Sequence, residues 1–143
     1  MIAIDTNLLI YAHRGGAPEH KAAIRSLEKA FSALDGWGIA FPSLAEFWSI
    51  VTHPKCADRP SHPAEAAGFI SEIIKDGEGQ IWLPGQNFTQ RAMQMAVTFN
   101  VMGARFFDLQ IGLIATENGA HTIWTHDKNF LKLPGLTIFD PLQ

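Results

Sequence analysis

Four carboxylates in this sequence are of the kind that could together hold a divalent cation: Asp5, Glu46, Asp108 and Asp127. If the fold gathered them without compensation, their like charges would raise one another's pKa. A divalent cation removes that conflict. Oxygen ligands with positions left for water favour Mg²⁺ or Mn²⁺ over Zn²⁺. The side chains therefore predict a hard-cation centre, provided that the fold brings them together.

Each of these acids, taken singly, also has an ordinary structural explanation. Asp5 could be the N-cap of a helix, and Glu46 could complete a capping box with Ser43, three residues earlier. Asp108 is favourable in the first turn of a helix because of the helix dipole, and Asp127 could cap a short turn. For each acid alone, the structural role and the metal-ligand role both stay open. Only a shared position of the four acids can decide between them.

The elements that would position the acids can be read from the apolar pattern. Short apolar runs predict strands at Met1–Ile4, Gly38–Phe41, Gln80–Leu83 and His121–Thr125, with Thr137–Phe139 as an optional fifth. Helical spacing predicts helices at Asn7–His13, from Pro18 to Leu34, and at Ser43–His53, Pro63–Gly77, Asn87–Asn100 and Phe107–Asn118. A loop is expected from Cys56 to Ser61.

Strands that alternate with helices predict an α/β fold with a mostly parallel central sheet of four to five strands and helices on both faces. Right-handed crossovers then place the carboxyl ends of all strands at one edge, where ligand sites form. Three of the acids follow a strand and the fourth opens a helix that leads into one, so all four are expected at this edge. The whole chain, residues 1–143, is expected to form one domain.

Composition limits the classes of protein that the chain could be. A hydrophobic share of 47% argues against disorder, and Cys56 is the single cysteine, which suits a reducing compartment such as the cytoplasm. The N-terminus lacks the features of a secretory signal, and no apolar run is long enough for a membrane span. A net charge of −3 counts against a broad basic face for nucleic acid, but it is compatible with an acidic pocket that binds Mg²⁺ first.

Several motifs in order along the chain resemble the PIN domain, and in detail the VapC-type toxins of type II toxin–antitoxin modules. They are Asp5-Thr6-Asn7, Leu44-Ala45-Glu46-Phe47-Trp48, Val51-Thr52-His53-Pro54, the helix Asp108–Ala115, and Thr125-x-Asp127 before Phe130. The sequence departs from the family pattern in two places. Asn129 stands where many members carry an acid, and Leu109-Gln110 replaces the usual small apolar pair.

The resemblance implies a PIN-like three-layer sandwich and a cytoplasmic ribonuclease that depends on Mg²⁺ or Mn²⁺ and inhibits translation. It also implies a homodimer held silent by an antitoxin protein, with no membrane association. On this reading Asp5 and Asp108 are the main metal ligands, and Glu46 and Asp127 bind the ion directly or through water. Thr6 and Thr125 would orient these groups. RNA contacts are expected from loop cations, for which a simple solvated face is the alternative: Arg14, Lys55, Arg59 and Lys128.

Two other functions stay open at this stage. A PIN-like fold could be a non-catalytic module that only grips a partner, although retention of all four acids argues against this. A phosphohydrolase with Asp5 as its nucleophile would need a second acid two residues on, where the sequence has Asn7.

Overall fold

The computed structural model describes residues 1–56 and 59–143, so the middle of the loop expected from Cys56 to Ser61 lies outside the described residues. Five strands form one sheet in the order β3-β2-β1-β4-β5, and every neighbouring pair is parallel. The strands are β1 Ile2–Ile4, β2 Trp37–Ala40, β3 Gln80–Trp82, β4 Thr122–Trp124 and β5 Thr137–Phe139. The expected parallel sheet is confirmed, including its fifth strand.

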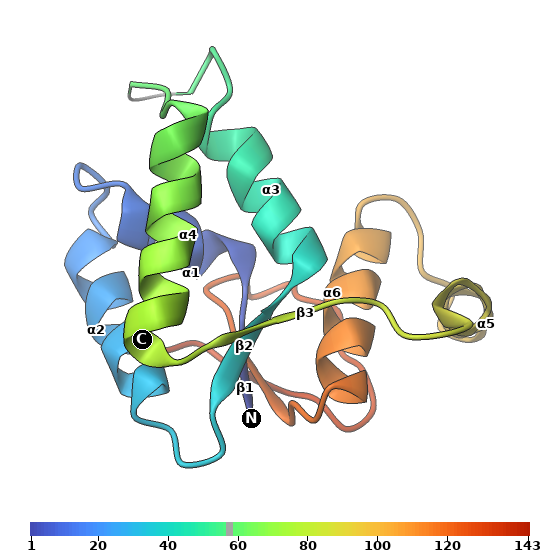
Figure 1. Cartoon of the computed structure of the whole chain (residues 1–143). Helices are drawn as coiled ribbons and strands as arrows, with labels where there is room; N and C mark the ends of the chain where they lie inside the picture. The colour runs from blue at the N-terminus through green and yellow to red at the C-terminus, as the bar shows by residue number, and fades with distance from the viewer. Residues whose placement is uncertain (57–58) are drawn as a thin grey trace.

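Helices cover both faces of this sheet. The six helices are α1 Thr6–His13, α2 His20–Phe31, α3 Phe41–Val51, α4 Pro63–Gly77, α5 Phe88–Thr98 and α6 Arg105–Glu117. The first, second and fourth helices lie together on one side, α6 lies on the other, and α5 stands beyond α6 (Figure 1). The expected three-layer PIN-like sandwich is therefore confirmed.

Two apolar cores hold these layers to the sheet. The first joins α1, α2, α3 and α4 to one face, with Leu8, Leu27 and Phe47 among its fully buried side chains. The second joins α6 to the other face and includes Ile123 and Phe130.

Several element boundaries differ from the expected ones. The α3 helix begins at Phe41 instead of Ser43, because Pro42 occupies its first turn, where a proline is tolerated. The α2 helix ends at Phe31, so Leu34 does not join the apolar stripe and is fully exposed. Similarly, β3 ends at Trp82, which leaves Leu83 exposed, and α5 ends before Phe99, whose side chain is 45% exposed.

None of the helices in residues 1–56 and 59–143 combines the length and the apolar character needed to cross a membrane.

Candidate metal centre

Asp5 lies where β1 ends and α1 begins, and it is the most buried of the four acids. It is the N-cap of α1, so its structural explanation is correct, and its Oδ1 accepts a hydrogen bond from the Thr6 backbone N–H at 2.8 Å. Its Oδ2 accepts a second bond from the Thr125 hydroxyl at 2.7 Å. Only 6% of the residue is exposed. Both oxygens are thus held in fixed directions by groups from two different strand ends.

The Thr125 hydroxyl joins the end of β4 to the start of α1. It donates to Asp5 and accepts from the Asn7 side-chain amide at 3.1 Å and from the Asp127 backbone N–H at 3.0 Å. The side-chain Oδ1 of Asn7 in turn accepts a hydrogen bond from the His126 backbone N–H at 3.1 Å. This linking role of Asn7 was not predicted from the sequence, although Asn7 stands in the same three-residue motif as Asp5.

Glu46 approaches the same edge from α3. Its Oε1 accepts a hydrogen bond from the Thr6 hydroxyl at 3.2 Å. The expected capping box with Ser43 is absent, because α3 begins before Ser43 and places that residue inside the helix. Glu46 is half-buried, so the carboxylate is directed to the neighbourhood of Asp5 by tertiary structure and not by a helix cap.

Asp108 and Asp127 complete the set from the other side of the edge. Asp108 lies in the first turn of α6, and its Oδ2 accepts from the Leu131 backbone N–H at 3.1 Å. Asp127 is exposed, and its Oδ1 accepts from the Asn129 backbone N–H at 2.9 Å, so it does cap the turn that follows β4. The second carboxylate oxygen of each acid makes no hydrogen bond to the described part of the chain.

The pKa values of three of the acids are raised by burial and by mutual repulsion. Burial raises the pKa of Asp5 from 3.8 to about 6, against the hydrogen bonds from Thr125 and Thr6, and the charges of Asp108 and Glu46 add to the rise. Burial likewise raises the pKa of Glu46, and the charge of Asp108 contributes. The pKa of Asp108 is raised by burial and by Asp127, while Leu131 and Arg105 oppose the rise. The four acids therefore act on one another.

A partly hydrated cation fits this donor set better than a fully protein-bound one. Among the described residues, no group of three or more His, Cys, Asp or Glu side chains lies close enough together to hold a metal ion by itself. Across residues 1–56 and 59–143, no ion pair involves any of the four acids. Carboxylate oxygens that repel one another and form no ion pair suit Mg²⁺ or Mn²⁺, which keep several waters and use one or two carboxylates.

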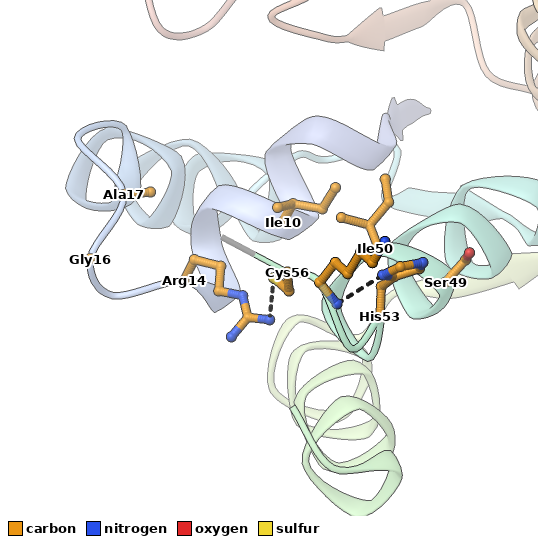
Figure 2. A pocket seen from close by; sticks show the side chains of 9 residues that line it. Ile10, Arg14, Gly16, Ala17, Ser49, Ile50, His53 and Cys56 are labelled. Carbon is orange, nitrogen blue, oxygen red and sulfur yellow. Dashed lines mark hydrogen bonds between the residues drawn. The ribbon is translucent and has the colours of Figure 1, made fainter. Parts of the chain in front are cut away.

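The cations expected to reach RNA have different surroundings. Arg14 donates to the Val51 and Arg59 carbonyl oxygens at 2.7 and 2.6 Å and to Cys56 Sγ at 3.0 Å, so it fastens this segment to the end of α1. Figure 2 shows Arg14 directed toward Cys56 in a pocket of about 720 Å³, which Lys55 also lines. Arg59 is paired with Glu65 at 3.2 Å. Lys128 is exposed and lies next to Asp127.

Comparison with known proteins identifies the family. The PIN domain model matches residues 2–136, so this chain belongs to the PIN domain family. Within curated proteins it is similar to the ribonuclease VapC43 of Mycobacterium tuberculosis, at 26% identity, with 100% of this chain and 97% of that protein covered. It is also similar to ribonuclease VapC24 of the same organism, at 25% identity with 99% and 97% coverage.

Solved structures share the fold. The M. tuberculosis VapC20 structure, described as a sarcin–ricin loop cleaving toxin, matches with a TM-score of 0.68 at 15% identity, covering 91% of this chain and 92% of that one. The structure of VapBC2 from Rickettsia felis bound to a promoter DNA fragment matches with a TM-score of 0.66 at 18% identity, covering 98% of both chains.

Proposed function

We propose that this protein is an endoribonuclease that depends on Mg²⁺ or Mn²⁺. The observation that carries the proposal is the buried Asp5 carboxylate, which repels Glu46 and Asp108, while none of the three forms an ion pair within the described chain. Leaving carboxylates in this state costs stability unless a ligand compensates them. The curated relatives named as ribonucleases support RNA as the substrate.

Asp5 and Asp108 would hold the ion directly, and Glu46 and Asp127 would bind it directly or through water. When bound, the ion supplies Lewis-acid chemistry, lowering the pKa of a water and stabilising charge on the phosphate. Thr125 keeps the Asp5 carboxylate in one orientation, and Thr6 does the same for Glu46. Burial of Asp5 excludes bulk water from that side of the site.

We further propose that the chain is the toxin of a bacterial toxin–antitoxin module and inhibits translation. Solved neighbours described as VapBC2 and FitAB, each bound to DNA, support a protein antitoxin as partner. A cytoplasmic location follows from this role, because the substrate RNA is in the cytoplasm.

The same proposal includes a homodimer. Exposed apolar side chains gather beside Glu46, where Phe41, Ile50 and Phe107 line a groove between α3 and α6. Each of these three side chains is close to half exposed. Apolar groups that cluster in this way are characteristic of protein contacts, and we assign the groove to a second copy of the chain.

The nuclease proposal is tested by incubating purified protein with total RNA in EDTA, and then with Mg²⁺ or Mn²⁺. Asp5→Asn and Asp108→Asn are assayed alongside. Asp76→Asn, at an exposed position of α4, is the matched control. We expect metal-dependent cleavage in the wild type and the control, and a loss of at least about 100-fold in both site variants. Wild-type rates in Asp5→Asn would contradict the assignment. Metal binding without cleavage by any variant would favour the non-catalytic partner-binding module.

A further inference from the structure

We propose that a basic pocket beside the acids binds the phosphate backbone of single-stranded RNA. This pocket, hereafter the basic pocket, is lined by Phe99, Arg105, Lys128 and Lys132 together with residues 129–131, and has a volume of about 430 Å³. The inference deepens the proposed function, on which it rests, by assigning where the substrate strand lies next to the reacting phosphate.

Positive charge is concentrated around the basic pocket. The chain has 11 lysines and arginines and a net charge of −3, yet three of its cations line this one pocket. All three are exposed, and no ion pair within the described ranges involves any of them. By contrast, Arg59 is paired with Glu65 and Arg14 is bonded to backbone carbonyls. The basic pocket therefore gathers three cations that form no ion pair and can attract a polyanion.

The basic pocket directly adjoins Asp108 and Asp127. Arg105 stands three residues before Asp108 on α6, a spacing that places both on the same helix face. Lys128 follows Asp127 directly, and the backbone N–H of Leu131, a residue that lines the basic pocket, donates to Asp108. A strand whose phosphate reaches the acids would thus place a neighbouring phosphate in the basic pocket.

An exposed aromatic side chain also lines the basic pocket. Phe99 lines the basic pocket, is 45% exposed, and belongs to neither apolar core of the described chain. Cations together with an exposed aromatic ring form the usual surface for single-stranded nucleic acid, because unpaired bases stack on the ring while cations hold the backbone. Unpaired RNA is therefore the form of substrate that the basic pocket fits.

The test measures binding of a fluorescent single-stranded RNA oligonucleotide to the full chain in EDTA, where metal-dependent cleavage cannot occur. Affinities at several salt concentrations are compared for wild type and for Lys128→Ala/Lys132→Ala. The control pair Lys21→Ala/Lys29→Ala removes the same charge from exposed positions of α2. Melting temperatures check that each variant is folded.

In a plot of log affinity against log salt, the slope is negative. We expect Lys128→Ala/Lys132→Ala to make it shallower by about 1.4, or about 0.7 for each phosphate that is no longer neutralised by a lysine. The control pair should leave the slope at the wild-type value. Phe99→Ala should weaken binding by about tenfold without changing the slope, because stacking involves no charge.

Equal slopes for the pocket and control pairs would overturn the inference and leave the basic pocket to another kind of partner, even if the chain cleaves RNA. A shallower slope for the pocket pair, in a chain that cuts no RNA with any metal, would uphold the RNA site and overturn only the nuclease proposal.

Discussion

The Thr125 hydroxyl is the point on which the geometry of the acidic site depends. It is 1% exposed and makes hydrogen bonds to Asp5, Asn7 and the Asp127 backbone. A single hydroxyl can donate once and accept twice, so its capacity is fully used. Asn7 makes a second link between the same strand ends, through Thr125 and the His126 backbone N–H.

Replacing Thr125 by valine should therefore cost more than a typical surface change. Thr125→Val keeps the shape but leaves buried polar groups unpaired, and we expect about 3 kcal/mol lower stability in chemical denaturation. Affinity for Mn²⁺ should fall about 10- to 100-fold, because the orientation of Asp5 is lost. Thr125→Ser retains the hydroxyl and should stay near wild type in both measurements. Equal losses in the serine and valine variants would show that the hydroxyl is not responsible.

Asp5 itself should destabilise the metal-free protein near neutral pH. Its pKa of about 6 when folded exceeds the ordinary 3.8, so the folded state keeps a proton that the unfolded chain has lost. Stability should consequently fall as pH rises from about 4 to about 6, by up to about 3 kcal/mol.

The variant Asp5→Asn removes this pH-dependent loss, but it replaces one acceptor oxygen of Asp5 by an amide NH₂ group. The new amide and one former donor, the Thr6 N–H or the Thr125 hydroxyl, then each lack an acceptor. The net gain expected in metal-free protein at neutral pH is about 1 kcal/mol. Urea unfolding of both proteins in EDTA measures it, with the exposed Asp76→Asn as control. A metal-free Asp5→Asn that is less stable than wild type at neutral pH would refute the burial argument.

For single residues, the sequence predicted which side chains form the site better than which side chains bond to one another. The positions of Asp5 and Asp108 could be predicted because strands and helix starts follow from apolar spacing. The bond between Thr6 and Glu46 joins residues 40 apart in sequence and requires the packing of α3 beside α1. The role of Asn7 depends likewise on the pairing of β1 with β4.

The elements of the fold were mostly predictable, and the errors have common causes. Pro42 was expected to separate a strand from a helix that starts at Ser43, but it lies inside the first turn of α3. The apolar character of Leu34 suggested a longer α2, whereas the helix stops before a turn that ends at Gly36, which has a positive φ of 86°. Both boundaries are decided by backbone geometry, to which apolar spacing is insensitive.

Close packing between β2 and β3 gives a prediction about one glycine. A Cβ at Gly38 would come within 2.5 Å of the Trp82 ring and 2.9 Å of the Gln80 carbonyl oxygen. Gly38→Ala should therefore lower the free energy of unfolding by about 2 kcal/mol. In Gly68→Ala, where α4 leaves open space, the same change should raise stability by up to about 1 kcal/mol. Similar effects of both substitutions in thermal unfolding would contradict this packing.

At the scale of the whole molecule, the acids stand at the meeting of two kinds of surface. The basic pocket adjoins Asp108 and Asp127, and the apolar groove of α3 and α6 includes Glu46. This separation explains how a chain of net charge −3 could approach RNA locally and still present an apolar face to a second copy.

The proposed homodimer can be tested on that apolar face. Phe107→Glu places a charge in the groove, and we expect light scattering to show a monomer where the wild type is a dimer. Leu34→Glu makes the same kind of change at a fully exposed position outside the groove and should leave the dimer intact. A dimer that persists in Phe107→Glu would place the interface elsewhere.

The most direct test of the cation centre is calorimetric titration of the metal-free protein with Mn²⁺. At about pH 7.5, above the Asp5 pKa of about 6, we expect saturable binding with little proton release. At about pH 5 binding should be about tenfold weaker and should release a proton, because the ion must displace it from Asp5. Binding should be lost in Asp5→Asn and Asp108→Asn and retained in Asp76→Asn. Equal Mn²⁺ affinity in all four proteins would show that these carboxylates do not hold the ion, and would contradict the proposed metal centre.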